Sequence, residues 1–573
     1  MAQMIRRISL LWPPGREPTG RPSPRDAEWA EDLDVDSLAQ ALAADRRQVR
    51  HVRAILVALC HDLEVIRYRQ EVFADFSEDA ALRRVLRDIV PLLQELDDVR
   101  LRGASTSGNE LLQVLQRLRE LELYHQAVVQ LSDGLAPRPL RSTALRSLRQ
   151  ELERIRQSEQ FGQLEAELPG LREALQQVAS ITIGVNLDAE GRPVGAALLA
   201  VNPRPFTSPK GLLARLLGDG ADSAGECLAP LHKVADHSPS PFLQPLFRDL
   251  AEVLRQVSRP VARALDRYLR VQTALLADLA SEVQFYLGAH ALAERLRSQG
   301  LPVCRPVIAT LEQRASHVEG LYNVSLALRL QERPPEPGRP EQPVPSDLDL
   351  GPRGRSAVLT GPNLGGKTTF IQAIGQAHLL AQAGLFAPGT FAELSPADGI
   401  YTHFPRTERP DREAGRLGEE AQRLAALFAG ATPYSLVLLN ESLSSTGPSE
   451  ALYLAQDLLR ALRLLGARVV YATHLHSLAA QLDQINDTAP HEPPTVSLVA
   501  GLLPPEERTS ADDMGRTYKV APGPPLGRSY AAEVARRYGI GLEQLTRCLK
   551  ERGIALEGDE PESKTIASSS TEH

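Results

Sequence analysis

Apolar residues recur every three or four positions from about Val35 to Gly170, which predicts a series of long amphipathic helices. Stripes such as Ile55, Leu59, Leu63 and Ile66 illustrate the pattern. Proline and glycine are sparse there except around 101–109 and 133–139, which we interpret as breaks between helices. The N-terminal part of the chain is therefore predicted to be all-α.

The periodicity changes at residues 181–201. Two runs rich in β-branched and apolar residues, 181–186 and 194–201, flank the polar segment 188–192, which predicts a small β-hairpin inserted between helices. Helical periodicity returns from about Pro241 to Gln331. The proline-rich segment 332–345 is then expected to be an extended linker.

Beyond this linker, short apolar runs alternate with helical stretches. Runs at 357–359, 399–403, 435–439 and 468–471 have the length of buried strands, which indicates an α/β domain with a mostly parallel sheet. Ligand groups in such sheets gather at the carboxyl ends of the strands. Lys367, Glu441 and His474 each follow a predicted strand, so we expect an active site at this edge.

The segment from Gly361 to Thr368 has the form Gly-x-x-x-x-Gly-Lys-Thr between a predicted strand and a predicted helix. This is the P-loop pattern, in which small residues let backbone N–H groups and the helix N-terminus face phosphate oxygens. Lys367 would reach the β- and γ-phosphates of ATP, and the Thr368 hydroxyl would bind Mg²⁺. The alternative is a glycine-rich turn with a solvated lysine. The predicted nucleotide-binding residues are Gly361, Pro362, Asn363, Leu364, Gly365, Gly366, Lys367, Thr368 and Thr369.

Asn440 and Glu441 directly follow the predicted buried strand at 435–439. In P-loop ATPases an acidic residue here holds Mg²⁺, and a following Glu orients the attacking water. Glu441 can polarise water. Asn440 is uncharged but can still accept a hydrogen bond from a Mg²⁺-bound water, so metal binding should weaken rather than vanish. Thr368 and Asn440 are the predicted metal site, and Glu441 and His474 the predicted catalytic residues. A lone histidine after a strand can also be structural; its placement favours a role at the γ-phosphate.

Composition limits the partners only in part. The 573 residues carry a net charge of −8, so no global basic field indicates nucleic-acid binding. A basic helix face at 140–156 is interpreted as solvated and paired with nearby acids rather than contacting phosphates. The four cysteines are widely spaced, and no apolar run is long enough to span a bilayer. We expect a cytoplasmic protein without membrane contact.

The ordered motifs of the C-terminal half resemble those of the MutS family of ABC-type ATPases. The resemblance covers roughly residues 320–550 and rests on these segments: Thr360–Thr369, Ser395–Thr402, Ala431–Glu441, Ser444–Thr446, Tyr471–His474 and Tyr518–Val520. Upstream, the segments 67–73 and 183–186 look like parts of the family's helical core and lever, with a reduced clamp. The resemblance implies a homodimer through the ATPase domain, with Gly415, Arg416 and Gly418 as a loop acting on the partner's nucleotide.

Three departures from the family pattern stand out. Asn440 replaces the usual Asp, and Gly415 stands where mismatch-repair members have a serine. No α/β mismatch-reading domain is recognised before the helices. Phe76-Ser-Glu78 fits a mismatch reader's Phe-x-Glu, but it lies in a helical pattern and is interpreted as a coincidence. Val344 and Tyr322 are the candidates for stacking on adenine.

The expected organisation is a flexible arm (1–35), an all-α core and lever with the hairpin (36–320), an α/β P-loop ATPase domain of ABC type (321–552) and a disordered tail (553–573). The expected function is that of a dimeric, slow, switch-like ATPase. It would bind a DNA structure or mismatch and open or close its helical arms in DNA repair or recombination. The alternative is a nucleotide-gated scaffold that binds a protein partner and no DNA.

Overall fold

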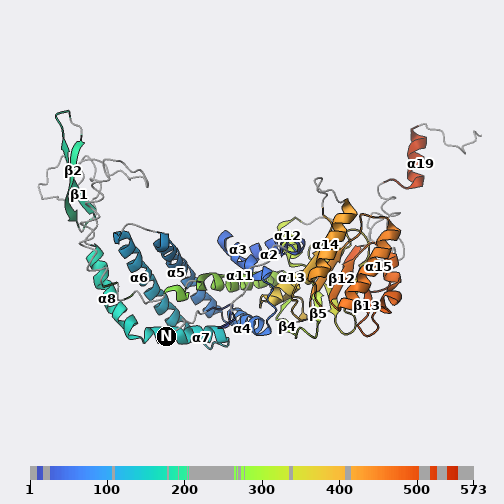
Figure 1. Cartoon of the computed structure of the whole chain (residues 1–573), viewed down its shortest axis with the longest axis horizontal. Coiled ribbons are helices and arrows are strands. Elements are labelled where there is room, and N and C mark those ends of the chain that lie inside the picture. The colour runs from blue at the N-terminus through green and yellow to red at the C-terminus, as the bar shows by residue number, and fades with distance from the viewer. Residues whose placement is uncertain are drawn as a thin grey trace, which may run out of the picture. The chain divides into compact units, whose positions relative to one another are not determined.

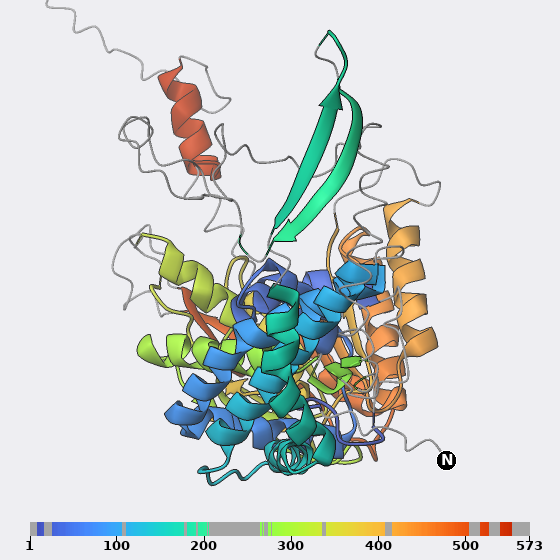
Figure 2. The ribbon, with the colours of Figure 1, turned by 90° about the vertical axis from the view of Figure 1, so that its left-hand side faces the viewer.

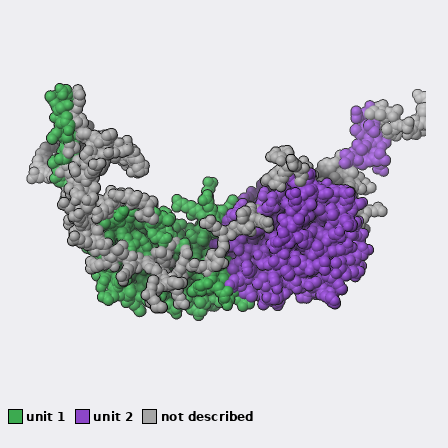
Figure 3. Space-filling model, viewed as in Figure 1, with its two compact units in different colours: residues 1–20, 40–52, 64–294 green, residues 21–39, 53–63, 295–573 purple. Residues whose placement is uncertain are grey.

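The structure is a computed structural model that describes residues 9–16, 26–105, 110–176, 180–190, 193–202, 204, 264–265, 268, 273–276, 278–334, 340–406, 415–502, 516–525 and 539–552. The chain forms two compact units (Figure 3). The helical unit comprises residues 1–20, 40–52 and 64–294; the α/β unit comprises residues 21–39, 53–63 and 295–573. The expected tail 553–573 lies outside the described residues.

The helical unit is built from the amphipathic helices that the periodicity predicts (Figure 1). Its principal helices are α4 (Leu63–Glu78), α5 (Ala80–Ser105), α6 (Glu110–Leu135), α7 (Thr143–Arg156), α8 (Glu159–Gln176) and α11 (Leu279–Ser298), and a 3₁₀ turn spans Thr273–Leu276. Residues such as Leu93, Leu121 and Leu131 are fully buried, so the apolar stripes form the core. Helices α2 (Val35–Leu42) and α3 (Arg46–Val57) begin or end in the α/β unit.

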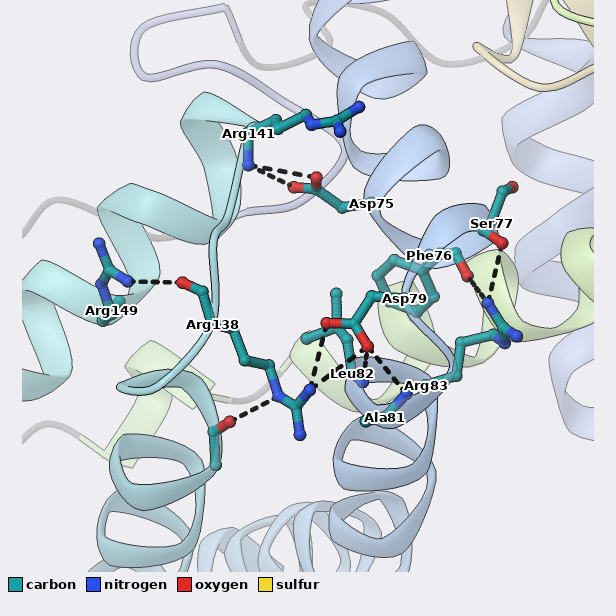
Figure 4. A network of polar contacts seen from close by, with 11 residues as sticks. Asp75, Phe76, Ser77, Asp79, Ala81, Leu82, Arg83, Arg138, Arg141 and Arg149 are labelled. Carbon is teal, nitrogen blue, oxygen red and sulfur yellow. Dashed lines mark hydrogen bonds and ion pairs between the residues drawn. The ribbon is translucent and has the colours of Figure 1, made fainter.

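A polar network fixes the junction of α4 and α5 (Figure 4). Asp79 caps α5 by accepting hydrogen bonds from the backbone N–H groups of Ala81 and Leu82, and it also pairs with Arg138 at 3.1 Å. Asp75 accepts from the backbone N–H of Ser142 at 2.8 Å, so two carboxylates attach this junction to the turn before α7.

Phe76 in α4 is fully buried, and its ring centroid lies 5.2 Å from that of Tyr286. A core phenylalanine cannot enter a DNA stack without unfolding its helix. The interpretation of Phe76-Ser-Glu78 as a chance match therefore agrees with its place in the core.

The predicted hairpin is present as β1 (Ser180–Leu187) and β2 (Pro193–Asn202), paired antiparallel with Val185 opposite Ala196. Figure 2 shows it as a long two-stranded ribbon. Val185, Leu187, Val194 and Leu199 are all more than a third exposed, because two strands alone cannot bury both faces.

The expectation of a flexible arm at 1–35 is wrong for the part that the structure describes. In the helical unit, Leu10 and Leu11 are buried, and Glu282 accepts a hydrogen bond from the Leu10 N–H at 2.6 Å. In the α/β unit, Asp26–Asp32 form α1, whose Trp29 is buried. The segment is rich in proline and glycine, so its composition did not indicate that Leu10, Leu11 and Trp29 would be buried.

The α/β unit contains a six-stranded sheet in the order β10-β11-β12-β7-β13-β14. Its strands are β7 (Ser356–Thr360), β10 (Ile400–His403), β11 (Leu436–Asn440), β12 (Arg468–Ala472), β13 (Thr495–Leu502) and β14 (Arg516–Pro522). All pairs are parallel except β13 with β14. The main helices of this unit are α13 (Lys367–Gln382), α14 (Arg416–Gly430) and α15 (Pro448–Leu465).

Smaller elements complete the α/β unit. A second sheet has the order β4-β9-β5-β6, and β3 pairs with β8. These elements are β3 (Val303–Cys304), β4 (Val307–Ile308), β5 (Ser316–Leu321), β6 (Ser346–Leu350), β8 (Ala387–Pro388) and β9 (Phe391–Leu394), with helices α12 (Val324–Glu332), α16 (His476–Ala480), α17 (Leu482–Asn486) and α19 (Leu542–Glu551).

The prediction of helix up to Gln331 was wrong for residues 303–321, which contribute β3, β4 and β5. Their partners β6, β8 and β9 lie later in the chain, so local periodicity could not reveal the pairing. Among the described helices, none combines the length and hydropathy needed to cross a membrane.

Candidate active site

The glycine-rich loop 361–366 connects the fully buried strand β7 to α13. Gly361 (φ 143°) and Gly366 (φ 95°) have positive backbone angles that favour glycine. A Cβ on Gly361 would lie 2.8 Å from that of Ala500 on β13, so the loop also needs glycine for space. Leu364 has φ 61° and is 77% exposed at the loop's outer side. The loop therefore adopts the curled path expected from the sequence.

Lys367 begins α13 beneath this loop and is 4% exposed. Its Nζ donates to the carbonyl oxygens of Gly361 and Pro362, each at 3.0 Å. Burial lowers the pKa of Lys367, and the nearby Glu441 carboxylate opposes that shift. An ammonium group held this way by the loop is placed to meet an anion bound in the loop.

Thr368 and Asn440 lie next to each other although 72 residues separate them. The Thr368 hydroxyl donates to Asn440 Oδ1 at 3.3 Å, at the end of strand β11. A hydroxyl and an amide oxygen are ligands that suit a hard divalent cation such as Mg²⁺. The pair fits the predicted metal site in chemistry, with less negative charge than an acid would supply.

Glu441 and His474 are brought together by the neighbouring parallel strands β11 and β12. Asn440 is in register with Ala472, and the Glu441 N–H donates to the Ala472 carbonyl at 2.8 Å. His474 Nε2 lies 2.8 Å from Glu441 Oε1. This hydrogen bond is the main reason that the pKa of Glu441 is lowered; burial opposes it, and the charges of His474 and Lys367 add to it. The carboxylate is thus kept ionised beside the loop.

The predicted trans-acting residues lie at the start of α14. Gly415 is the exposed N-cap of this helix, without a side chain to cap it, and Gly418 is exposed in the first turn. The side chain of Arg416 and residues 407–414 lie outside the described part. Of the two candidates for stacking on adenine, Tyr322 is 2% exposed, which leaves its ring no free face, and Val344 is partly exposed.

Several residues near the site were missed by sequence reasoning. His403 at the end of β10 contacts Ser442, and Glu420 on α14 accepts a hydrogen bond from Ser445 at 2.8 Å. Glu28 on α1 pairs with Arg423 of α14 at 3.5 Å. For His403, the available signal in the sequence was a histidine at the end of a predicted strand. The contacts of Glu420 with Ser445 and of Glu28 with Arg423 join residues far apart in the chain, so no local pattern indicates them.

Two parts of the chain match known protein-family models. A family model described as the MutS2 N-terminal domain matches residues 61–299, and one described as MutS domain V matches residues 357–549. The chain belongs to the MutS family. The two matches cover parts of both units, including most of the predicted helices and the loop 361–368.

Curated relatives of the MutS family share part of this chain. An Endonuclease MutS2 of Thermomicrobium roseum is 31% identical over 330 residues, which cover 55% of this chain and 38% of that protein. A DNA mismatch repair protein MutS of Granulibacter bethesdensis is 29% identical over 328 residues, 54% of this chain and 33% of the relative. An Endonuclease MutS2 of Thermus thermophilus is 31% identical over 204 residues, 36% and 25% of the two chains. The chain thus spans about a third of the length of these relatives.

Proposed function

We propose that this MutS-family chain is a Mg²⁺-dependent ATPase with an ABC-type P-loop domain. The observation that carries the proposal is the convergence of Lys367, Glu441 and His474 at the carboxyl ends of β7, β11 and β12. Ligands of α/β sheets bind at this edge. The α13 N-terminus adds a partial positive charge at the same place.

Each residue then has a role in hydrolysis of ATP. Lys367 and the backbone N–H groups of the loop 361–369, apart from Pro362, bind the phosphates. Thr368 and Asn440 would hold Mg²⁺, which, when bound, offsets the charge of the phosphate oxygens. Glu441, whose pKa is lowered mainly by its hydrogen bond to His474, orients and polarises the attacking water. His474 holds the carboxylate through its contact with Glu441 and would detect the γ-phosphate.

The chain is further proposed to act as a homodimer through its ATPase domain. Gly415, Arg416 and Gly418 would then approach the nucleotide of the partner subunit. The exposed N-terminus of α14 supports this role, because free backbone N–H groups at a helix start attract anions. Hydrolysis would be slow and switch-like, and it would open or close the helical arms.

The proposed ligand of the helical unit is DNA, recognised by shape and backbone, in repair or recombination. Support comes from the family membership and from relatives whose names include mismatch repair and endonuclease. The second candidate is a nucleotide-gated scaffold that binds a protein.

One observation favours this second candidate. On α7, Arg154 pairs with Glu151 and Arg156 with Asp133, and Arg149 lies 3.9 Å from Glu153. The basic face is therefore largely neutralised by its own neighbours, which weakens its attraction for phosphates.

The ATPase proposal is tested with two variants measured side by side. Glu441→Gln should bind ATP with the affinity of the wild type and lose turnover, whereas Lys367→Ala should lose ATP binding. Binding is followed with a fluorescent ATP analogue and turnover by phosphate release. Normal hydrolysis by Glu441→Gln would show that another group activates the water.

The two ligand proposals are separated by electrophoretic shift of linear and branched duplexes, with and without ATP, over a series of salt concentrations. DNA binding through phosphate contacts should weaken as salt rises. Absence of binding to every duplex at low salt would remove the DNA proposal and leave the scaffold.

A further inference from the structure

The turn that follows β11 has an unusual backbone. Glu441 has φ 50° and Leu443 has φ 66°, so two non-glycine residues flank Ser442 in the left-handed region. Non-glycine residues in this region are strained and persist only where surrounding contacts fix them. The turn carries the Glu441 carboxylate, so whatever fixes the turn also fixes the carboxylate.

Three buried groups fix this turn at Ser442, which is 3% exposed. His403 Nδ1 lies 2.7 Å from Ser442 Oγ, and the same hydroxyl donates to the His403 carbonyl at 3.4 Å. From the other side, the Tyr471 hydroxyl donates to the Ser442 carbonyl at 2.8 Å. Ser442 is thus held by β10 and β12, the two neighbours of its own strand β11.

The protonation of this cluster follows from burial. His403 is 1% exposed, and burial, helped by the charge of Arg423, lowers the pKa of His403 to about 3. The ring is therefore neutral under working conditions. With Ser442 donating to the His403 carbonyl, Nδ1–H is the donor to Ser442 Oγ. Nε2 then carries no proton, and it has no hydrogen-bond partner among the described residues.

We infer that His403, Ser442 and Tyr471 are positioning residues that hold the Glu441 carboxylate against the attacking water. The inference rests on the proposed ATPase function. The His403 ring bonds to the Ser442 side chain, and the Tyr471 hydroxyl bonds to the Ser442 carbonyl. The neighbouring Glu441 N–H bonds to β12, so we expect the effect of these residues on hydrolysis to pass through Glu441. The glycine-rich loop and Lys367 make none of these hydrogen bonds, so nucleotide binding is separate from this support.

The first test compares Ser442→Ala with Ser497→Ala by steady-state kinetics. Ser497 lies on β13 of the same sheet, and its Oγ is buried and without a partner among the described residues, so its loss controls for removal of a hydroxyl. Ser442→Ala should lower kcat about 10- to 100-fold with KM for ATP unchanged, because small misplacements of a catalytic group have effects of this size. Ser497→Ala should keep the wild-type kcat.

Conservative variants distinguish positioning from general support of the fold. His403→Asn retains a polar group at about the distance of Nδ1 and should keep much of the activity, whereas His403→Gln places its amide farther out and should not. Tyr471→Phe removes only the hydroxyl and should lower kcat severalfold. If Ser442→Ala fails to fold, the His403 and Tyr471 variants still test the inference.

A double variant shows whether the effect passes through Glu441. Ser442→Ala added to Glu441→Gln should not lower the residual rate further. A wild-type kcat for Ser442→Ala, or equal activities of His403→Asn and His403→Gln, would overturn the inference while leaving the ATPase proposal intact. A wild-type protein that hydrolyses no ATP would overturn both.

Discussion

At Gly288, α11 packs directly against the end of α2. A Cβ at this position would lie 1.8 Å from the carbonyl oxygen and 2.9 Å from the carbonyl carbon of Leu42, the last residue of α2. The obstacle is backbone, so no rotamer change can relieve the overlap. Gly288→Ala should force the two helices apart, which costs about 1–3 kcal/mol or more. The higher helix propensity of alanine returns only about 1 kcal/mol.

Gly162 in α8 provides a matched control, because a Cβ there meets no atom within 4 Å. Gly162→Ala should leave stability unchanged or raise it by up to about 1 kcal/mol. Urea unfolding gives the change in stability, and hydrogen exchange of peptides from α2 and α11 locates it. The packing argument is refuted if Gly288→Ala is as stable as Gly162→Ala, or if exchange in α11 is unchanged.

Three further predictions concern the site and the helical junction. Asn440→Asp should lower the Mg²⁺ concentration needed for half-maximal turnover, because a carboxylate joins the Thr368 hydroxyl; an unchanged requirement would place Asn440 away from the metal. His474→Ala should raise the pKa of Glu441, so the acid limb of the kcat–pH profile should move to higher pH; an unmoved limb would mean that this carboxylate does not control the rate. Burial raises the pKa of Asp79, but its hydrogen bonds from Leu82, Arg138 and Ala81 outweigh this and lower it. The stabilisation by Asp79 is therefore present at neutral pH and is lost as pH falls below its ordinary value of 3.8. Asp79→Ala should destabilise the helical unit by about 1–2 kcal/mol at pH 7, measured by urea unfolding, and a stability difference that persists undiminished at pH 3 would contradict the capping role.

Much of this architecture can be predicted from local patterns in the sequence. The strand, loop and helix at 356–382 follow from an apolar run, glycines at two positions that need positive φ, and a helix-forming stretch. The hairpin at 180–202 and the amphipathic helices of the first half follow from their periods. These features depend on residues within a few positions of each other, so a linear pattern is enough to predict them.

Other segments show how a local pattern can be right in kind and wrong in extent. Residues 303–321 read as a continuation of helix, yet they form strands because β8, β9 and β6 provide their partners. Residues 9–16 and 26–32 read as an arm, yet Leu10 and Trp29 are buried in cores assembled from distant segments. In both cases long-range packing overrides a weak local preference.

By itself, the sequence determined that Lys367, Glu441 and His474 each follow a strand, and the parallel α/β pattern then predicted that they share an edge. Only the tertiary structure decided the strand order that puts β12 beside β11 and so brings His474 within 2.8 Å of Glu441. It also decided that β10 flanks β11 on the other side, which brings His403 to Ser442. The order of strands depends on how the helices between them pack on the sheet, and that is a property of the whole core rather than of any one segment.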